Sequence, residues 1–264
     1  MGLFQDVFNP KTIEDMLFFN IKAVLIYPTY KGFAESNPQL FERWKYLSKV
    51  KYNADYESVQ PTDDAFLQKT YEDNAVQYPE FCKILAITYA TTYVEAGVLK
   101  RNIKKIASDN EVDNINKFMD VLKAISGDGV KSTPQYFPIL CGHNIIAYEI
   151  PLLIKRYMVK RNDVEIKHIP FILKNALSVK PWESGIVDTV NVWKFNGFDY
   201  SPLMLVSDFL GLKKSVDLLA HNELSKTYWS SFATEPQKAL EFVSLQSATQ
   251  TNLVIQLINE LRQV

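Results

Sequence analysis

Apolar and polar positions along the chain form two kinds of pattern, one typical of strands and one typical of helices. Short runs that are continuously apolar or rich in β-branched and aromatic residues predict strands over 21–27, 83–94, 98–106 and 137–141. Apolar residues at helical spacing predict helices over 11–19, 38–50, 111–125, 147–161, 202–210 and from Pro236 to the end. Strands mixed with helices in this way predict an α/β fold with a mixed sheet flanked by helices.

The segment 29–80 is the least regular part of this pattern. It is polar and, outside the helix predicted over 38–50, it is expected to be an irregular insertion. Pro28 lies just before it and is expected to end the first strand, because proline cannot donate a hydrogen bond to a sheet ladder. With no internal repeat, residues 1–264 are predicted to form a single domain that contains this insertion.

Composition narrows the classes of function. The 264 residues carry a formal net charge of −1, whereas dedicated nucleic-acid binders are usually basic, so any contact with nucleic acid is expected to use a local basic face. Two cysteines without a Cys/His cluster indicate neither a disulfide framework nor a zinc site. No secretory leader and no apolar run of about 20 residues are visible, so we expect a cytoplasmic protein without membrane contact.

The most informative motif is the stretch 141–151, which reads CGHNIIAYEIP. Asn144 lies four residues before Tyr148, and the acidic Glu149 follows the tyrosine. This spacing resembles the second motif of DnaQ-like 3'-5' exonucleases, in the subfamily related to the proofreading domain of family B DNA polymerases, where an Asp follows the aromatic residue. Weaker similarities occur in the family's order at 180–183, 187–189, 193–195, 203–211 and 223–229. The resemblance implies an RNase H-like fold.

The resemblance also implies a site of four acidic residues that hold two divalent cations. The family pattern Asp-x-Glu at the end of the first strand falls on Pro28 and Tyr30. The second motif offers Glu149 where the family has Asp. The Tyr-x-x-x-Asp pattern of the last helix falls on Phe242 and Gln246. One carboxylate in place of four leaves two dications nearly uncompensated, so we expect a catalytically inactive homologue without a cofactor.

Two alternatives stay open at this point. In the first, the protein is an active 3'-5' exonuclease with a rebuilt site for Mg²⁺ or Mn²⁺ around Glu149. In the second, it is a structural or interaction protein without a nucleic-acid role. Glu149 has a structural explanation as well, because an acidic residue near a helix N-terminus is stabilised by the helix dipole.

An inactive homologue is expected to be retained for binding single-stranded nucleic acid or a protein partner. The candidate nucleic-acid contacts are His143, Asn144, Tyr148, Lys155 and Arg156. A second basic group lies on the strand predicted over 98–106 and consists of Lys100, Arg101, Lys104 and Lys105. The competing interpretation is that these cations form solvated faces, that Asn144 caps a helix, and that Asp188 is structural.

Overall fold

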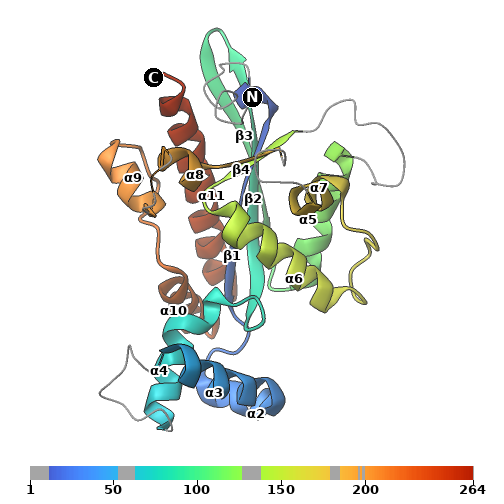
Figure 1. The fold of residues 1–264 in the computed structure, drawn as a ribbon, viewed down its shortest axis with the longest axis vertical. Coiled ribbons are helices and arrows are strands. Elements are labelled where there is room, and N and C mark those ends of the chain that lie inside the picture. Colours follow the sequence, from blue (N-terminus) through green and yellow to red (C-terminus); the bar gives the residue numbers. More distant parts are fainter. Residues whose placement is uncertain are drawn as a thin grey trace. The chain divides into compact units, whose positions relative to one another are not determined.

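The computed structural model describes residues 12–52, 63–126, 138–178, 185–195, 197 and 200–263 (Figure 1). The features predicted at residue 11, residue 137 and residues 180–183 lie outside these ranges. The chain divides into two compact units. Unit 1 comprises Met1–Lys22, Ile84–Leu218 and Glu241–Val264, and unit 2 comprises Ala23–Lys83 and Leu219–Leu240.

Unit 1 is built on a five-stranded sheet with the strand order β3-β2-β1-β4-β5. The strands are β1 (Met16–Leu25), β2 (Cys82–Glu95), β3 (Val98–Ala107), β4 (Ile139–Gly142) and β5 (Ile186–Asp188). β2 and β3 form an antiparallel hairpin, whereas β4 pairs in parallel with both β1 and β5. The predicted class is confirmed: this is an α/β fold with a mixed sheet flanked by helices.

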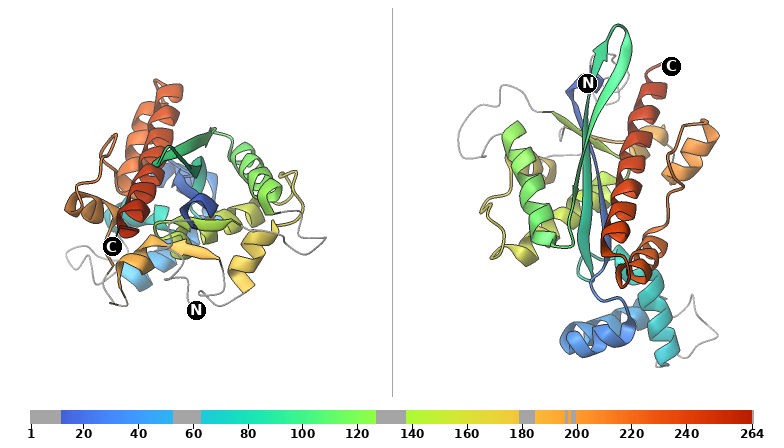
Figure 2. Two further views of the ribbon diagram at one scale, coloured as in Figure 1. Left: turned by 90° about the horizontal axis from the view of Figure 1, so that it is seen from above. Right: turned by 180° about the vertical axis from the view of Figure 1, so that it is seen from behind.

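Helices cover both faces of this sheet (Figure 2). α5 (Glu111–Ser126) lies on one face, where the Phe118 ring packs 5.5 Å from the Phe19 ring of β1. α11 (Pro236–Leu261) lies on the other face, where Leu253 and its neighbours share a core cluster with Phe18 and Ala90. The alternation of Phe18 and Phe19 between the two faces follows from the two-residue period of a strand.

The first strand begins earlier than the sequence pattern predicts. A short 3-10 turn, η1 (Thr12–Asp15), leads directly into β1 at Met16, so the helix predicted over 11–19 is wrong where the structure describes it. The strand ends at Leu25, not at Tyr27. All ten residues of β1 are buried. A short apolar run that is buried on both faces looks alike in a strand and in a helix, which is why the pattern did not decide.

Unit 1 contains further helices along the chain. They are α6 (Ile150–Lys160), α7 (Phe171–Ser178), α8 (Thr189–Trp193) and α9 (Leu203–Phe209). A single π-type turn, η4 (Ile145–Glu149), precedes α6. The helices predicted over 111–125, 147–161 and 202–210 and the C-terminal helix are confirmed within a few residues at their ends.

Unit 2 replaces the predicted irregular insertion with helices. It contains α2 (Tyr30–Ser36), α3 (Pro38–Tyr52), α4 (Asp64–Asn74), the 3-10 turn η3 (Ala75–Gln77) and α10 (His221–Phe232). Side-chain caps start two of them, since Thr29 accepts from the Gly32 amide and Asp63 from the Ala65 amide. Buried aromatic rings hold the helices together; for example, Phe33 stacks on Tyr71 at 5.1 Å.

Across the described residues, no helix is both long and apolar enough to span a bilayer.

Candidate functional site

Two polar side chains interrupt the apolar first strand, and both are buried. Asn20 is 1% exposed and Lys22 is 2% exposed. They lie two residues apart on β1, so their side chains leave the same face of the sheet. That face carries α11, because the Lys22 Nζ donates to the Gln250 Oε1 at 2.6 Å. A buried ammonium is costly unless it is paired, so this position calls for partners.

The main acidic partner comes from the turn after β4. β4 pairs with β1 in the register Phe18↔Cys141, which brings the end of β4 beside Asn20. Gly142 is required there, since a Cβ on it would lie 2.9 Å from the Phe19 carbonyl oxygen and would clash with Ile145. The π-type turn η4 then directs Glu149 inward, where its side chain is 2% exposed.

Asn20, Lys22, Glu149 and Gln250 form what we call the Lys22 cluster. The Asn20 Nδ2 donates to the Glu149 Oε1 at 2.8 Å. The Ser247 hydroxyl of α11 donates to the Asn20 carbonyl oxygen at 3.1 Å, which joins the last helix to the same point of β1. Within the described residues, the Asn20 Oδ1 and the Glu149 Oε2 have no hydrogen-bond partner. These two buried oxygens therefore depend on the nearby positive charge of Lys22 for their stabilisation.

Burial and mutual attraction act in opposite directions on the charges of this cluster. Burial raises the pKa of Glu149 from its ordinary 4.5 to about 8, and the attraction of Lys22 limits the rise. Burial lowers the pKa of Lys22 from 10.5 to about 8, and the attraction of Glu149 limits that fall. Both groups are therefore poised to change protonation close to neutral pH.

A second buried carboxylate, Asp188, shapes the turn that carries Glu149. The Asn144 and Val190 amides donate to its Oδ1 at 2.7 and 3.1 Å, and the Ile146 amide donates to its Oδ2 at 3.1 Å. Asp188 therefore caps α8 and the start of η4 together, as a structural role predicts. Asn144 occupies the capping position with φ 65°, but its side chain makes no capping hydrogen bond.

His143 is held in a neutral form next to this turn. Its Nδ1 lies 2.9 Å from the Thr189 hydroxyl, and that hydroxyl donates to the Gly142 carbonyl oxygen at 3.1 Å. The hydroxyl proton is thus committed, so the Nδ1 is the protonated nitrogen and donates to Thr189. Burial lowers the pKa of His143 to about 4. The ring of Tyr200 lies 6.3 Å from the imidazole. Tyr200 is 55% exposed, so the site meets solvent at this residue.

The structure places Pro28 and Tyr30 in unit 2, beyond the end of β1. Pro28 lies between β1 and α2 and lines a cavity together with Thr29 and Trp229. Tyr30 is the first residue of α2; its ring is buried and packs 4.8 Å from that of Phe41. Tyr30 thus contributes to the aromatic packing of unit 2, and Pro28 lines a cavity of the same unit.

The remaining predicted residues are distributed as follows. The Gln246 Nε2 donates to the Asp217 carbonyl oxygen at 2.8 Å, and Phe242, one turn earlier, is half-buried. Lys155 is exposed on α6 and Tyr148 is half-buried. Arg156 is 4% exposed, so it does not belong to the solvated basic face that the sequence predicted.

Arg156 instead forms the buried ion pair of unit 1. Its Nε and Nη2 donate to the two carboxylate oxygens of Glu111 at 2.8 and 2.6 Å. The Glu111 Oε1 also accepts from the Ile84 amide at 2.8 Å. This arrangement links α6, α5 and β2, and it has a structural rather than a ligand-binding role.

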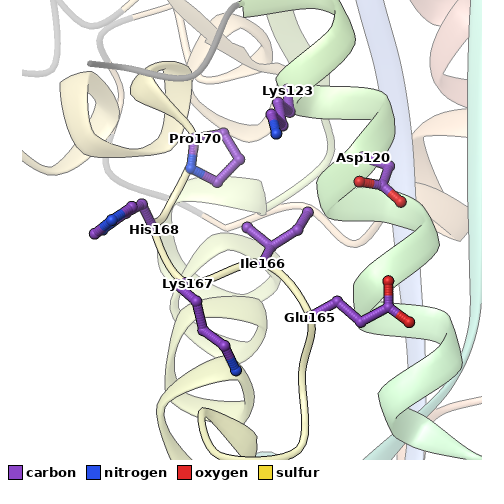
Figure 3. A pocket seen from close by; sticks show the side chains of 7 residues that line it. All are labelled: Asp120, Lys123, Glu165, Ile166, Lys167, His168 and Pro170. Atoms are coloured by element: carbon purple, nitrogen blue, oxygen red, sulfur yellow. The ribbon is translucent and has the colours of Figure 1, made fainter.

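One further concave surface of unit 1 lies apart from these residues. A cavity of about 330 Å³ is lined by α5 and the segment 165–170 (Figure 3). Its lining mixes the carboxylates of Asp120 and Glu165 with the cations of Lys123 and Lys167. A lining of mixed charge favours neither an anionic nor a cationic ligand.

The donor set of the Lys22 cluster does not match a divalent cation. Hard cations such as Mg²⁺ need several oxygen ligands with compensating negative charge. The cluster offers one carboxylate and two amides, and its ammonium repels a cation. No group of three or more His, Cys, Asp or Glu side chains with metal-binding geometry occurs in the described part of the chain.

Asn20, Lys22 and Gln250 are the site residues that sequence reasoning missed. The available signal was a lysine and an asparagine inside the apolar run 16–25. A charge in such a run predicts a buried group that needs a partner. The predicted helix over 11–19 hid this signal, because it placed Asn20 at a boundary instead of inside a strand.

Comparisons with known proteins identify no family for this chain. No family model matches it, and neither the curated proteins nor the solved structures contain a match. The α/β class is therefore stated from the coordinates alone.

Proposed function

We propose that this protein is an exonuclease-type domain with an RNase H-like fold that binds single-stranded nucleic acid without cleaving it. The observation that carries the proposal is the Lys22 cluster, in which a buried ammonium lies among side chains from the first strand, the turn after β4 and the last helix. These are the three segments from which the DnaQ-like family draws its acidic residues.

The order of elements supports this proposal. Unit 1 runs through a strand, an antiparallel hairpin, α5, a fourth strand, α6 and α7, a fifth strand, α8 and α9, and the long α11. The sheet order β3-β2-β1-β4-β5 places the first strand in the centre. An RNase H-like domain has this arrangement, with its site on the central strand. Because fold alone does not define activity, the side chains at the site must carry the functional argument.

The cluster also suggests a different register for the family motifs. Asn20-Ile21-Lys22 keeps the one-residue spacing of Asp-x-Glu and lies inside β1, whereas Pro28 and Tyr30 follow its end. In the last helix, Gln250 reaches the cluster, while Gln246 bonds to Asp217. On this register, each acidic position except Glu149 is occupied by an amide or an ammonium.

This composition favours a binding protein over an enzyme. In a two-metal nuclease the cations orient the attacking water and stabilise the leaving oxygen. Here Lys22, whose pKa is about 8, supplies one positive charge at neutral pH, and at 2% exposure it is not open to a water or a phosphate oxygen. Glu149, Asn20 and Gln250 then serve to hold that charge in the interior.

A nuclease assay tests the proposed inactivity. Single-stranded and 3'-overhang DNA and RNA are incubated with the protein in Mg²⁺ and in Mn²⁺, with Glu149→Gln as the control. We expect no metal-dependent shortening by either protein. Shortening by the wild type that is lost in Glu149→Gln would instead establish the alternative of a rebuilt metal site.

A designed metal site tests the register. We expect the triple change Asn20→Asp, Lys22→Glu and Gln250→Asp to create four carboxylates with Glu149, and hence a Tm that rises in millimolar Mn²⁺ relative to EDTA. The matched control replaces Gln250→Asp by Gln246→Asp, which points at the Asp217 carbonyl, and its Tm should not respond. Equal responses of the two variants would contradict the register.

A second candidate function is that of an interaction protein, and one observation favours it. Apolar side chains around α9 are exposed: Phe195 is 57%, Leu205 is 61% and Phe209 is 78% exposed. Exposed apolar groups that lie together commonly mark contact surfaces. If this candidate holds, light scattering should detect self-association that Phe209→Ser removes and that Met158→Ser, an exposed apolar residue on α6, leaves unchanged.

A further inference from the structure

The hairpin of β2 and β3 has a charge unlike that of the chain as a whole. Residues 91–107 carry four cations and one acid, whereas the full chain has a net charge of −1. We call Lys100, Arg101, Lys104 and Lys105 the hairpin cations. All four are exposed on β3, which is the outermost strand of the sheet. Among the described residues none of them forms an ion pair, so their positive charge faces solvent.

Aromatic side chains lie opposite two of these cations on one face of the hairpin. The register pairs Tyr93 with Lys100 and Tyr89 with Lys104. Directly opposite residues of an antiparallel pair project to the same face, so two tyrosines and two lysines share one surface. Tyr89 is held against the Phe118 ring at 6.2 Å, whereas Tyr93 is 48% exposed. Tyr93 therefore presents an available ring beside Lys100.

We infer that this face of the hairpin, centred on Tyr93, Lys100 and Lys104, binds single-stranded nucleic acid. The inference rests on the proposed function and specifies where binding occurs. Cations that follow a backbone and an aromatic ring that stacks on a base are the two parts of sequence-tolerant single-strand binding. A duplex keeps its bases stacked on one another, so it offers Tyr93 no base and only its phosphates remain for contact.

Lysines on an edge strand have another explanation, because they also prevent pairing with other sheets. That explanation requires the charges but assigns no role to Tyr93. Substitution of the ring without any change in charge therefore separates the two explanations.

The experiment measures fluorescence anisotropy of dye-labelled oligothymidylate, its RNA equivalent and a duplex between about 50 and 200 mM salt. We expect Lys100→Gln/Lys104→Gln to weaken single-strand binding by tenfold or more at low salt. The slope of log K against log salt should fall by about 1.4, since each single-strand phosphate contact contributes about 0.7. Tyr93→Thr should weaken binding by roughly 5- to 150-fold, which corresponds to ~1–3 kcal/mol per stacked base, and leave the slope unchanged.

The control is Arg161→Gln/Lys213→Gln, which removes two exposed cations outside the hairpin and changes net charge equally. We expect this pair to bind like the wild type. Equal losses in the hairpin pair and in the control pair, an unaffected Tyr93→Thr, or tighter binding of the duplex would overturn the hairpin inference while nucleic-acid binding itself stands. A wild type that binds no probe at low salt would overturn the nucleic-acid role and the hairpin together. Metal-dependent cleavage would contradict only the proposed inactivity.

Discussion

Arg156→Met is expected to destabilise the folded protein by about 3–5 kcal/mol, the usual range when one partner of a buried ion pair is removed. Methionine fills much of the side-chain volume but leaves the Glu111 carboxylate buried with the Ile84 amide as its remaining recorded donor. The free energy of unfolding from urea denaturation measures the effect. A loss of this size is a large part of the free energy of unfolding of an ordinary domain.

The neighbouring residue supplies the control. Lys155 precedes Arg156 on α6 and is exposed, so Lys155→Met should change the free energy of unfolding by no more than about 0.5 kcal/mol. Adding Glu111→Gln to Arg156→Met should recover part of the loss, because the amide oxygen still accepts from Ile84 and no charge stays buried. A loss below about 1 kcal/mol in Arg156→Met would show that the Arg156–Glu111 ion pair contributes little to the free energy of unfolding.

The contrast between Lys155 and Arg156 also shows why the sequence predicted the fold better than the site. Strands β2 and β3 and helix α5 follow from local periodicity, and their predicted bounds are close to those observed. Whether an arginine on a helix faces solvent or a carboxylate 45 residues away depends on tertiary packing, which periodicity along one element does not contain. The predicted basic face failed at Arg156 for this reason.

The Lys22 cluster was missed for a related reason. Its members come from positions 20, 22, 149 and 250, and only Glu149 lies within a motif that resembles a known pattern. A search for acidic residues passes over Asn20 and Lys22, because neither of them is acidic. Their importance becomes visible once the β1–β4 register brings them beside Glu149. Asp188, by contrast, was predicted to be structural and does cap two segments.

The cluster leads to an unusual dependence of stability on pH, with a minimum near pH 8. The folded-state pKa of Glu149 is raised from 4.5 to about 8, so its contribution is present at low pH and is lost as pH rises through the folded value. The folded-state pKa of Lys22 is lowered from 10.5 to about 8, so above pH 8 the unfolded state binds more protons and stability recovers. Between pH 6.5 and 8, and again between pH 8 and 9.5, the change in the free energy of unfolding should amount to on the order of 1–2 kcal/mol.

Urea denaturation between pH 6.5 and 9.5 measures both arms. Burial raises the pKa of Cys141 above its ordinary 9.0, so ionisation of this thiol in the unfolded state opposes the rising arm near pH 9. His143 has a folded pKa of about 4 and an ordinary value of 6.5, so its contribution to stability is constant above about pH 7.5. Burial raises the pKa of Tyr200 from 10.0, which places its titration above the range. Asp188 has a raised pKa too, and any titration in this range would add to the falling arm, so the variants must separate the two carboxylates.

Glu149→Gln should remove the falling arm, and Lys22→Met should remove the rising arm. The amide resembles the protonated carboxyl and can still accept from the Asn20 Nδ2, so Glu149→Gln should be more stable than the wild type already at pH 6.5, and the difference should grow up to pH 8. A wild-type curve that is flat from pH 6.5 to 9.5 would show that the two charges are not desolvated as the structure indicates. Lys22 would then be solvated. The proposal that its buried positive charge prevents metal binding at this site would fail.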